Sequence, residues 1–158
     1  MAITRILGAT AISPTIPASA GGTGATSFAP GKIGQVLSAT KTDVFTTTST
    51  SYTDITGITI NITPAATNSK VLVTFSVTAS TDTTDRVFGF QLVRGSTAIG
   101  IGGSSGNRSV GTVAGAVETK NTKMNSYSMN FLDSPSSTSA VTYKLQTKAQ
   151  DGGSNTVR

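Results

Sequence analysis

The sequence predicts an all-β fold, a sandwich or a barrel, and two observations carry this prediction. The first is composition: 29 Thr and 20 Ser make up about a third of the 158 residues, and Thr favours strands while both residue types suit turns. The second is about eight short segments of alternating apolar and polar residues, spaced every 8 to 15 residues and separated by turn-forming residues. Helices are disfavoured, because β-branched residues and Gly outnumber strong helix formers.

The first segments of the domain differ in how clearly they show this alternation. Residues Gln35 to Lys41 are expected to form a first strand, and the Thr-rich Thr46 to Ser51 is either an extended edge or a loop. Ile58, Ile60 and Ile62 alternate with polar residues, which predicts a half-buried strand that ends at Pro64.

The clearest strand is Lys70 to Ala79, where Val71, Val73, Phe75 and Val77 share one face. Arg86 to Arg94 follows a polar turn at Thr81 to Asp85 and has Phe88, Phe90 and Leu92 on one face, so the two segments are expected to form a hairpin. Gly95-Ser96 predicts a tight turn into a short strand at Thr97 to Ile101.

Three further strands complete the expected set. Val110 to Val117 has small side chains on both faces, which indicates either a subunit contact or a bulge or tight bend of the sheet. Met124 to Leu132 places Tyr127, Met129 and Phe131 on one face. The last inward-facing set is Val141, Tyr143 and Leu145.

The chain is expected to comprise an N-terminal arm at residues 1–20, a Gly-rich joint at 21–33 and a β-sandwich domain at 34–158. The arm is apolar without strand or helix periodicity, so it either docks on a partner or is an unstructured terminus. A third interpretation is a signal peptide that ends at Ala18-Ser19-Ala20. The apolar arm residues are Ile3, Ile6, Leu7, Ile12 and Ile16, and the joint glycines are Gly21, Gly22 and Gly24.

Composition also limits the chemistry that we expect. Because Cys and His are absent, disulfides, thiolate zinc sites, cysteine nucleophiles and histidine bases are excluded. The seven carboxylates fall mostly in predicted turns, where such groups usually cap the backbone. We therefore expect no enzyme, no metal and no cofactor. The net charge of +5 comes from dispersed basic residues, so we expect no nucleic-acid partner, and no apolar run is long enough for membrane insertion.

Several stretches resemble the fibre proteins of tailed bacteriophages, in particular those of marine and cyanobacterial phages. The linker Gly21 to Ser27 resembles the recurrent linker of such fibres, and five further stretches are similar to their receptor-binding or structural β-domains. These stretches are Gly31 to Leu37, Thr50 to Gly57, Ser69 to Val73, Phe90 to Gly95 and Phe131 to Pro135.

The resemblance implies a jelly-roll-like antiparallel sandwich, a homo-oligomer that is a trimer, and a virion location on the tail or capsid surface after assembly in the bacterial host cytoplasm. It also implies that the arm docks on other virion proteins, that loops contact the host surface, including host glycans, and that the domain lacks or borrows a final strand. Alternatives are a capsid-decorating or tail adaptor protein and a secreted bacterial carbohydrate-binding adhesin. The candidate receptor loops are Thr81 to Asp85, Gly102 to Ser109 and Asp133 to Ser139, with Asp82, Asp85, Asn107, Arg108 and Asp133 as candidate contacts.

Overall fold

A computed structural model describes residues 33–82, 86–104, 106, 110–117, 124–149 and 154–157. All regular secondary structure in these residues is β-strand, which confirms the all-β prediction. The chain divides into the units Met1–Val36 and Leu37–Arg158, and the strands belong to the second unit. The strands in the described residues are β1 (Phe45–Thr47), β2 (Thr53–Ile62), β3 (Val71–Thr81), β4 (Arg86–Arg94), β5 (Thr97–Ile99), β6 (Val113–Val117), β7 (Asn125–Asp133), β8 (Val141–Ala149) and β9 (Asn155–Val157).

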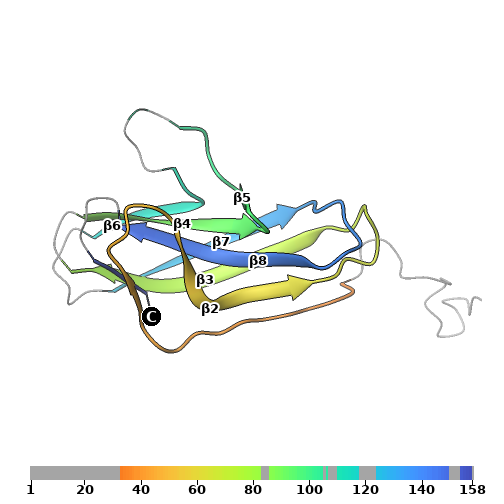
Figure 1. The fold of residues 1–158 in the computed structure, drawn as a ribbon, viewed down its shortest axis with the longest axis horizontal. Helices are drawn as coiled ribbons and strands as arrows, with labels where there is room; N and C mark the ends of the chain where they lie inside the picture. Colours follow the sequence, from red (N-terminus) through yellow and green to blue (C-terminus); the bar gives the residue numbers. More distant parts are fainter. Residues whose placement is uncertain are drawn as a thin grey trace, which may run out of the picture. The chain divides into compact units, whose positions relative to one another are not determined.

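The strands form two antiparallel sheets that pack face to face, with β2, β8 and β4 in front of β3 and β7 in the view of Figure 1. The four-stranded sheet has the order β1-β9-β3-β7. The five-stranded sheet has the order β2-β8-β4, and both β5 and β6 pair with the free side of β4. Several connections cross between the sheets, and β9 lies beside β1. This arrangement is the jelly-roll form of the β-sandwich.

Alternation of buried and exposed side chains explains why these segments form strands. In β3, Val71 and Val77 are buried while Leu72, Thr74 and Ser76 are exposed. Strand β8 buries every second residue from Tyr143 to Ala149 and leaves the residues between them half-exposed. A period of two residues places one set of side chains between the sheets and the other set on the outside. The sequence-based faces of these strands are therefore confirmed.

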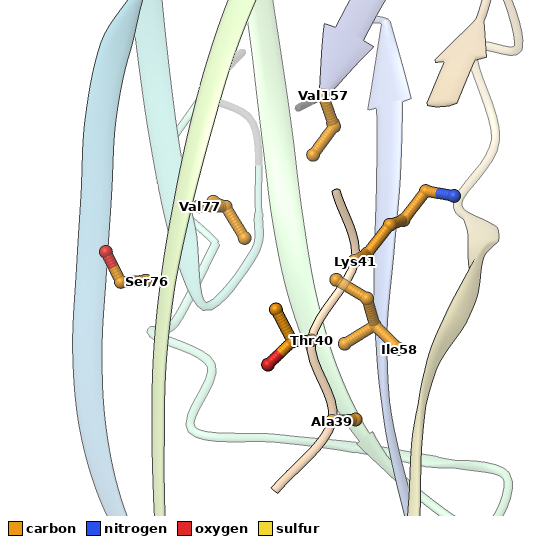
Figure 2. Close-up of a pocket in the computed structure, with 7 residues that line it drawn as sticks. All are labelled: Ala39, Thr40, Lys41, Ile58, Ser76, Val77 and Val157. Carbon is orange, nitrogen blue, oxygen red and sulfur yellow. The ribbon is translucent and has the colours of Figure 1, made fainter. Parts of the chain in front are cut away.

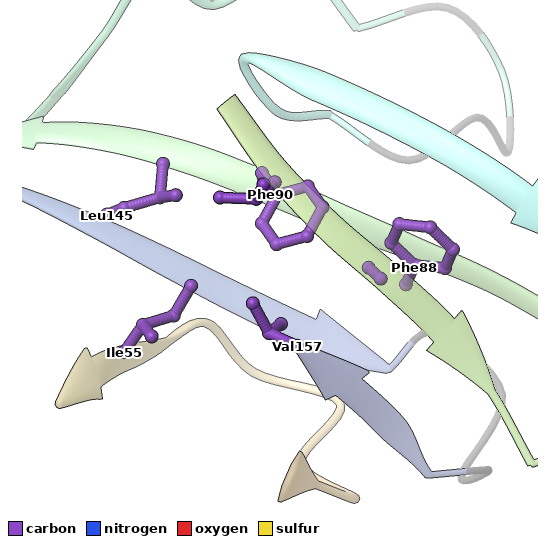
Figure 3. Close-up of a cluster of buried hydrophobic side chains, with 7 residues drawn as sticks. Ile55, Phe88, Phe90, Leu145 and Val157 are labelled. Carbon is purple, nitrogen blue, oxygen red and sulfur yellow. The ribbon is translucent and has the colours of Figure 1, made fainter. Parts of the chain in front are cut away.

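The core between the sheets is built around two phenylalanines of β4. Phe88 and Phe90 are fully buried, and Figure 3 shows them above Ile55 and Val157, with Leu145 to one side of Phe90. Phe88 also meets Tyr127 of the opposite sheet edge to face, with ring centroids 5.1 Å apart, an arrangement that aromatic rings prefer. A second buried cluster lies farther along the sandwich and consists of Val71, Leu92, Ile99 and Tyr143.

Two expectations about the strands are wrong, and one strand was not expected. Gln35 to Lys41 forms no strand, and the first strand starts only at Phe45. Strands β3 and β4 do not form a hairpin, because they belong to different sheets. An alternating pattern shows which face of a strand is buried, but it does not show whether the next strand pairs with it or packs against it. Strand β9 was not expected, since three residues are too few to show a period.

Strand β2 is longer than expected and contains an irregularity. Asp54 lies opposite Gln146 and Thr59 opposite Lys144, so five steps along β2 match two steps along β8. Gly57 lies within this bulge with φ of +88°, a backbone conformation that glycine adopts without steric cost. Asp54 lies opposite Gln146, and Lys144 is the next outward side chain along β8, so Asp54 contacts side chains from two positions of that strand.

Candidate functional site

The outer face of the five-stranded sheet carries a connected group of polar side chains from three strands. Each of them lies between inward-facing neighbours: Gln91 lies between the buried Phe90 and Leu92, and Gln146 between Leu145 and Thr147. We call this group the polar face. Its members are Asp54, Gln91, Lys144 and Gln146, which hydrogen bonds join, and Lys148, which lies beside them on the outer face of β8.

Hydrogen bonds connect the polar face in one direction across the sheet. Gln91 Nε2 donates to Gln146 Oε1 at 3.2 Å, and Gln146 Nε2 donates to Asp54 Oδ1 at 2.7 Å. Lys144 Nζ donates to the other oxygen of Asp54 at 2.8 Å. One carboxylate therefore orients two amides and one ammonium group. Gln91 Oε1, at the end of this row, accepts no bond from the described residues.

The charge of Asp54 is stabilised within this row. The hydrogen bond from Lys144 is the main cause that lowers the pKa of Asp54, the bond from Gln146 adds to it, and burial opposes both. Half of the Asp54 side chain is exposed, so this ion pair contributes little to folding stability. Its main effect is to hold the carboxylate ionised and in a fixed orientation on the surface.

Tyr52 borders the polar face and is held from two sides. Its hydroxyl donates a hydrogen bond of 2.6 Å to the backbone oxygen of Val110, which precedes β6. Lys148 Nζ lies 5.0 Å from the centre of the Tyr52 ring, within range for a cation–π interaction. A Cβ added to Gly111 would collide with the Tyr52 hydroxyl and approach the backbone oxygen of Phe90 to 2.9 Å. The absence of a side chain at Gly111 thus makes room for this tyrosine.

A second polar cluster lies between the sheets and serves the fold. Arg94 Nη1 lies 2.8 Å from Asp133 Oδ1, and the Tyr143 hydroxyl donates to Asp133 Oδ2 at 2.6 Å. Asp133 is only 6% exposed. Burial is the main cause that raises the pKa of Tyr143 far above its usual range, and the bond to Asp133 adds to the effect. Asp133 was expected to contact a receptor, but its carboxylate points into the sandwich.

A small pocket of about 160 Å³ lies beside β3. Figure 2 shows its lining, with the ammonium group of Lys41 pointing away from Ser76 and Val77. That group is paired with Asp43 at 2.7 Å. Pockets that hold small molecules usually measure about 300–1,000 Å³, so we interpret this pocket as a packing gap. It is lined by Ala39, Thr40, Lys41, Ile58, Ser76, Val77 and Val157.

The structure places Asp82 and Asp133, from two of the candidate receptor loops, near opposite ends of β3. Asp82 is exposed, and its Oδ1 accepts a hydrogen bond of 3.0 Å from the backbone nitrogen of Ser154. Val71 is paired with Asp133, so Asp133 and the end of β3 near Asp82 are separated by the length of that strand, about 33 Å for ten residue steps. The remaining predicted site residues lie outside the described residues: Ile3, Ile6, Leu7, Ile12, Ile16, Gly21, Gly22, Gly24, Asp85, Asn107 and Arg108.

The polar face was not identified from the sequence, although part of the signal was present. Lys144, Gln146 and Lys148 alternate with the inward residues of β8, which places all three on the outer face of one strand. Their connection to Asp54 and Gln91 depends on strand order, because β8 lies between β2 and β4. No local pattern in the sequence gives that order.

Comparisons of the chain with protein-family models, with curated proteins and with solved structures find no match. Across the described ranges, no three carboxylates lie close enough together to hold a metal ion. In the same part of the chain, no helix is long and apolar enough to cross a membrane.

Proposed function

We propose that this protein is a non-enzymatic attachment protein of a bacteriophage virion, fibre or fibre-like, whose polar face binds glycans of the host surface. The observation that carries the proposal is the row of hydrogen bonds from Gln91 through Gln146 to Asp54. The virion assignment rests on the resemblance of the linker and of the β-domain stretches to phage fibres.

The chemistry of the polar face suits a sugar. Sugars present many hydroxyl groups, each of which both donates and accepts hydrogen bonds; amide side chains offer both functions, and carboxylate side chains accept. Along β8 the outward side chains repeat about every 7 Å, and neighbouring strands lie about 4.8 Å apart. The polar groups therefore form a two-dimensional array on a rigid sheet, where little order must be gained on binding.

The surroundings of this row also support the proposal. Tyr52 adds an aromatic ring with a polar end beside the row, and such rings are common where a ligand is partly apolar and partly hydrated. Lys144 and Lys148 add two cationic groups, of which Lys144 is neutralised by Asp54. Lys148 would therefore favour glycans that carry acidic groups.

The rest of the virion function is proposed from the resemblance. Residues 1–20 dock on other virion proteins, and several copies of the domain assemble, with a trimer as the expected number. Several weak sites on one particle would bind a surface much more tightly than one site does. A capsid-decorating or tail adaptor protein is the second candidate, and a secreted adhesin with the same glycan-binding face is the third.

Glycan binding can be measured with the purified full chain on an array of bacterial surface polysaccharides. We expect binding that falls about fivefold to a hundredfold in Q91A/Q146A, because two amides worth about 0.5–1.5 kcal/mol each are removed. Ser76→Ala is the matched control, since Ser76 is exposed on the outer face of the opposite sheet. No glycan binding, or equal loss in S76A, would overturn the glycan proposal.

The virion assignment has a separate test. Mass spectrometry of purified phage particles that carry this chain should detect peptides from Met1 to Ala20. A mature chain that begins at Gly21 and occurs only in bacterial culture medium would instead support the adhesin. Release of free sugars from polysaccharides by the purified protein would contradict a non-enzymatic role.

A further inference from the structure

Within the part of the chain that the structure describes, strand β7 is a long sheet edge without the usual protection against pairing. It has nine residues, and all nine pair with β3 in continuous register from Asn125–Ala79 to Asp133–Val71. Among the described strands only β3 pairs with β7, so about half of its backbone N–H and C=O groups point away from the sheet. Before Asp133 the strand contains no charged residue, no proline and no bulge.

The other edges in the described part of the chain are interrupted. Strand β2 has the bulge between Asp54 and Thr59 and a charged pair on its outer face. The edge beside β4 is divided between β5 and β6, and β1 has only three residues. Proteins normally protect sheet edges by such interruptions or by charge. Strand β7 differs from the other edges in being long, regular and without a charged residue before Asp133.

The sequence of β7 is complementary to itself about Met129. If two copies pair antiparallel with Met129 opposite Met129, then Tyr127 lies opposite Phe131 on the inner face and Ser128 lies opposite Asn130 on the outer face. Aromatic pairs and polar pairs across neighbouring strands are both favourable. This register pairs all nine residues of each strand and places no like charges opposite one another.

We infer that β7 pairs antiparallel with β7 of a second copy of this chain about a two-fold axis at Met129. The four-stranded sheets of the two copies then form one continuous sheet, and the pairing adds about eight to ten backbone hydrogen bonds. The inference does not depend on glycan binding or on the virion assignment. Such a two-fold contact closes a dimer, so it is an alternative to the trimer that the resemblance implies.

The inner side of β7 is already held in place for this contact. A Cβ added to Gly100, which follows β5, would lie 3.1 Å from Phe131 and 3.4 Å from Met129. These two side chains therefore pack against Gly100, at the end of β5 in the five-stranded sheet. Hydrogen bonds with β3 hold the edge of β7 that faces away from the proposed contact. An edge that is fixed before pairing loses little conformational freedom when a partner strand is added. Leu132, which is 60% exposed, would gain Ser126 of the partner as its neighbour.

The register predicts a specific cross-link. The chain has no cysteine, so M129C introduces a single thiol, and only pairing centred on residue 129 brings two such thiols face to face. Directly opposite residues have Cα atoms about 4.5–5.5 Å apart, within the range for a disulfide. In air, M129C should form covalent dimers at least about tenfold faster than S126C, because Ser126 lies opposite Leu132 and not opposite itself. Equal rates would overturn the register.

Four further variants separate pairing from folding. Ser126 and Leu132 are both exposed, so S126C/L132C leaves the core intact, and it should form the same covalent dimer even if M129C does not fold.

S128K/N130K places lysines opposite one another and should weaken the dimer about tenfold or more. Mixing it with S128E/N130E should restore pairing as a heterodimer. T74K/S76K adds the same charges to β3, on the same face but away from the contact, and should leave the dimer unchanged.

Sedimentation equilibrium of the full chain, from micromolar to millimolar concentration, measures the association itself. A monomer–dimer equilibrium that S128K/N130K weakens supports the inference. A monomer throughout the range, or a trimer that S128K/N130K does not affect, overturns it.

Discussion

The hydroxyl of Tyr143 donates a hydrogen bond of 2.6 Å to the carboxylate of Asp133, and this bond joins the two sheets of the sandwich. Tyr143 belongs to β8 of the five-stranded sheet, and Asp133 ends β7 of the four-stranded sheet. Arg94, paired with Tyr143 across β4 and β8, supplies the neutralising charge. The buried carboxylate is thus satisfied by two groups from the opposite layer.

Removing the carboxylate of Asp133 should destabilise the domain strongly. In D133A the guanidinium of Arg94 and the hydroxyl of Tyr143 lose their shared acceptor, and breaking a buried pair in this way costs about 3–5 kcal/mol. Y143F removes one hydrogen bond and should cost about 1–2 kcal/mol. Urea unfolding measures both changes. D43A is the control, because the Asp43 side chain is 78% exposed. A D133A domain as stable as D43A would contradict this role of the buried cluster.

Asp54 should titrate at lower pH than an isolated carboxyl group. Because its folded pKa is depressed by Lys144 and Gln146, its contribution to stability is present above about pH 4 and is lost as the pH falls through the folded pKa. Titration followed by the NMR signal of the Asp54 carboxyl carbon measures this pKa. K144M should raise it, since the largest cause is removed, whereas K148M should not change it. Equal shifts in both variants would indicate a general charge effect instead of a specific bond.

Gly111→Ala should displace Tyr52 from its position beside the polar face. The new methyl group would collide with the Tyr52 hydroxyl and crowd the backbone oxygen of Phe90, and overpacking of this kind costs about 1–3 kcal/mol. Y52F/G111A should recover part of the loss, because the colliding oxygen is removed. Gly102→Ala is the matched control, since nothing lies within 4 Å of its added Cβ. Thermal unfolding compares the variants, and equal effects at Gly102 and Gly111 would be inconsistent with the crowding.

Local patterns predicted the strands better than they predicted the site. The inward faces of β3, β4, β7 and β8 followed from alternation alone, because burial on one side of a strand repeats every second residue. Asp133 was assigned to an exposed loop because it precedes a Ser-rich segment with a proline. Its burial depends on Arg94 and Tyr143, which lie far away in the sequence and approach it only when the two sheets pack.

By itself the sequence determined the fold class, the position of most strands and which side of each strand is buried. These properties depend on residues within one segment, where composition and period are visible. Only the tertiary structure decided that β3 and β4 lie in different sheets, that β9 lies between β1 and β3, and that Asp54, Gln146 and Gln91 form one row. Each of these depends on which strands become neighbours. Which strands become neighbours depends on the packing of the whole core, so it cannot be predicted from any single segment of the sequence.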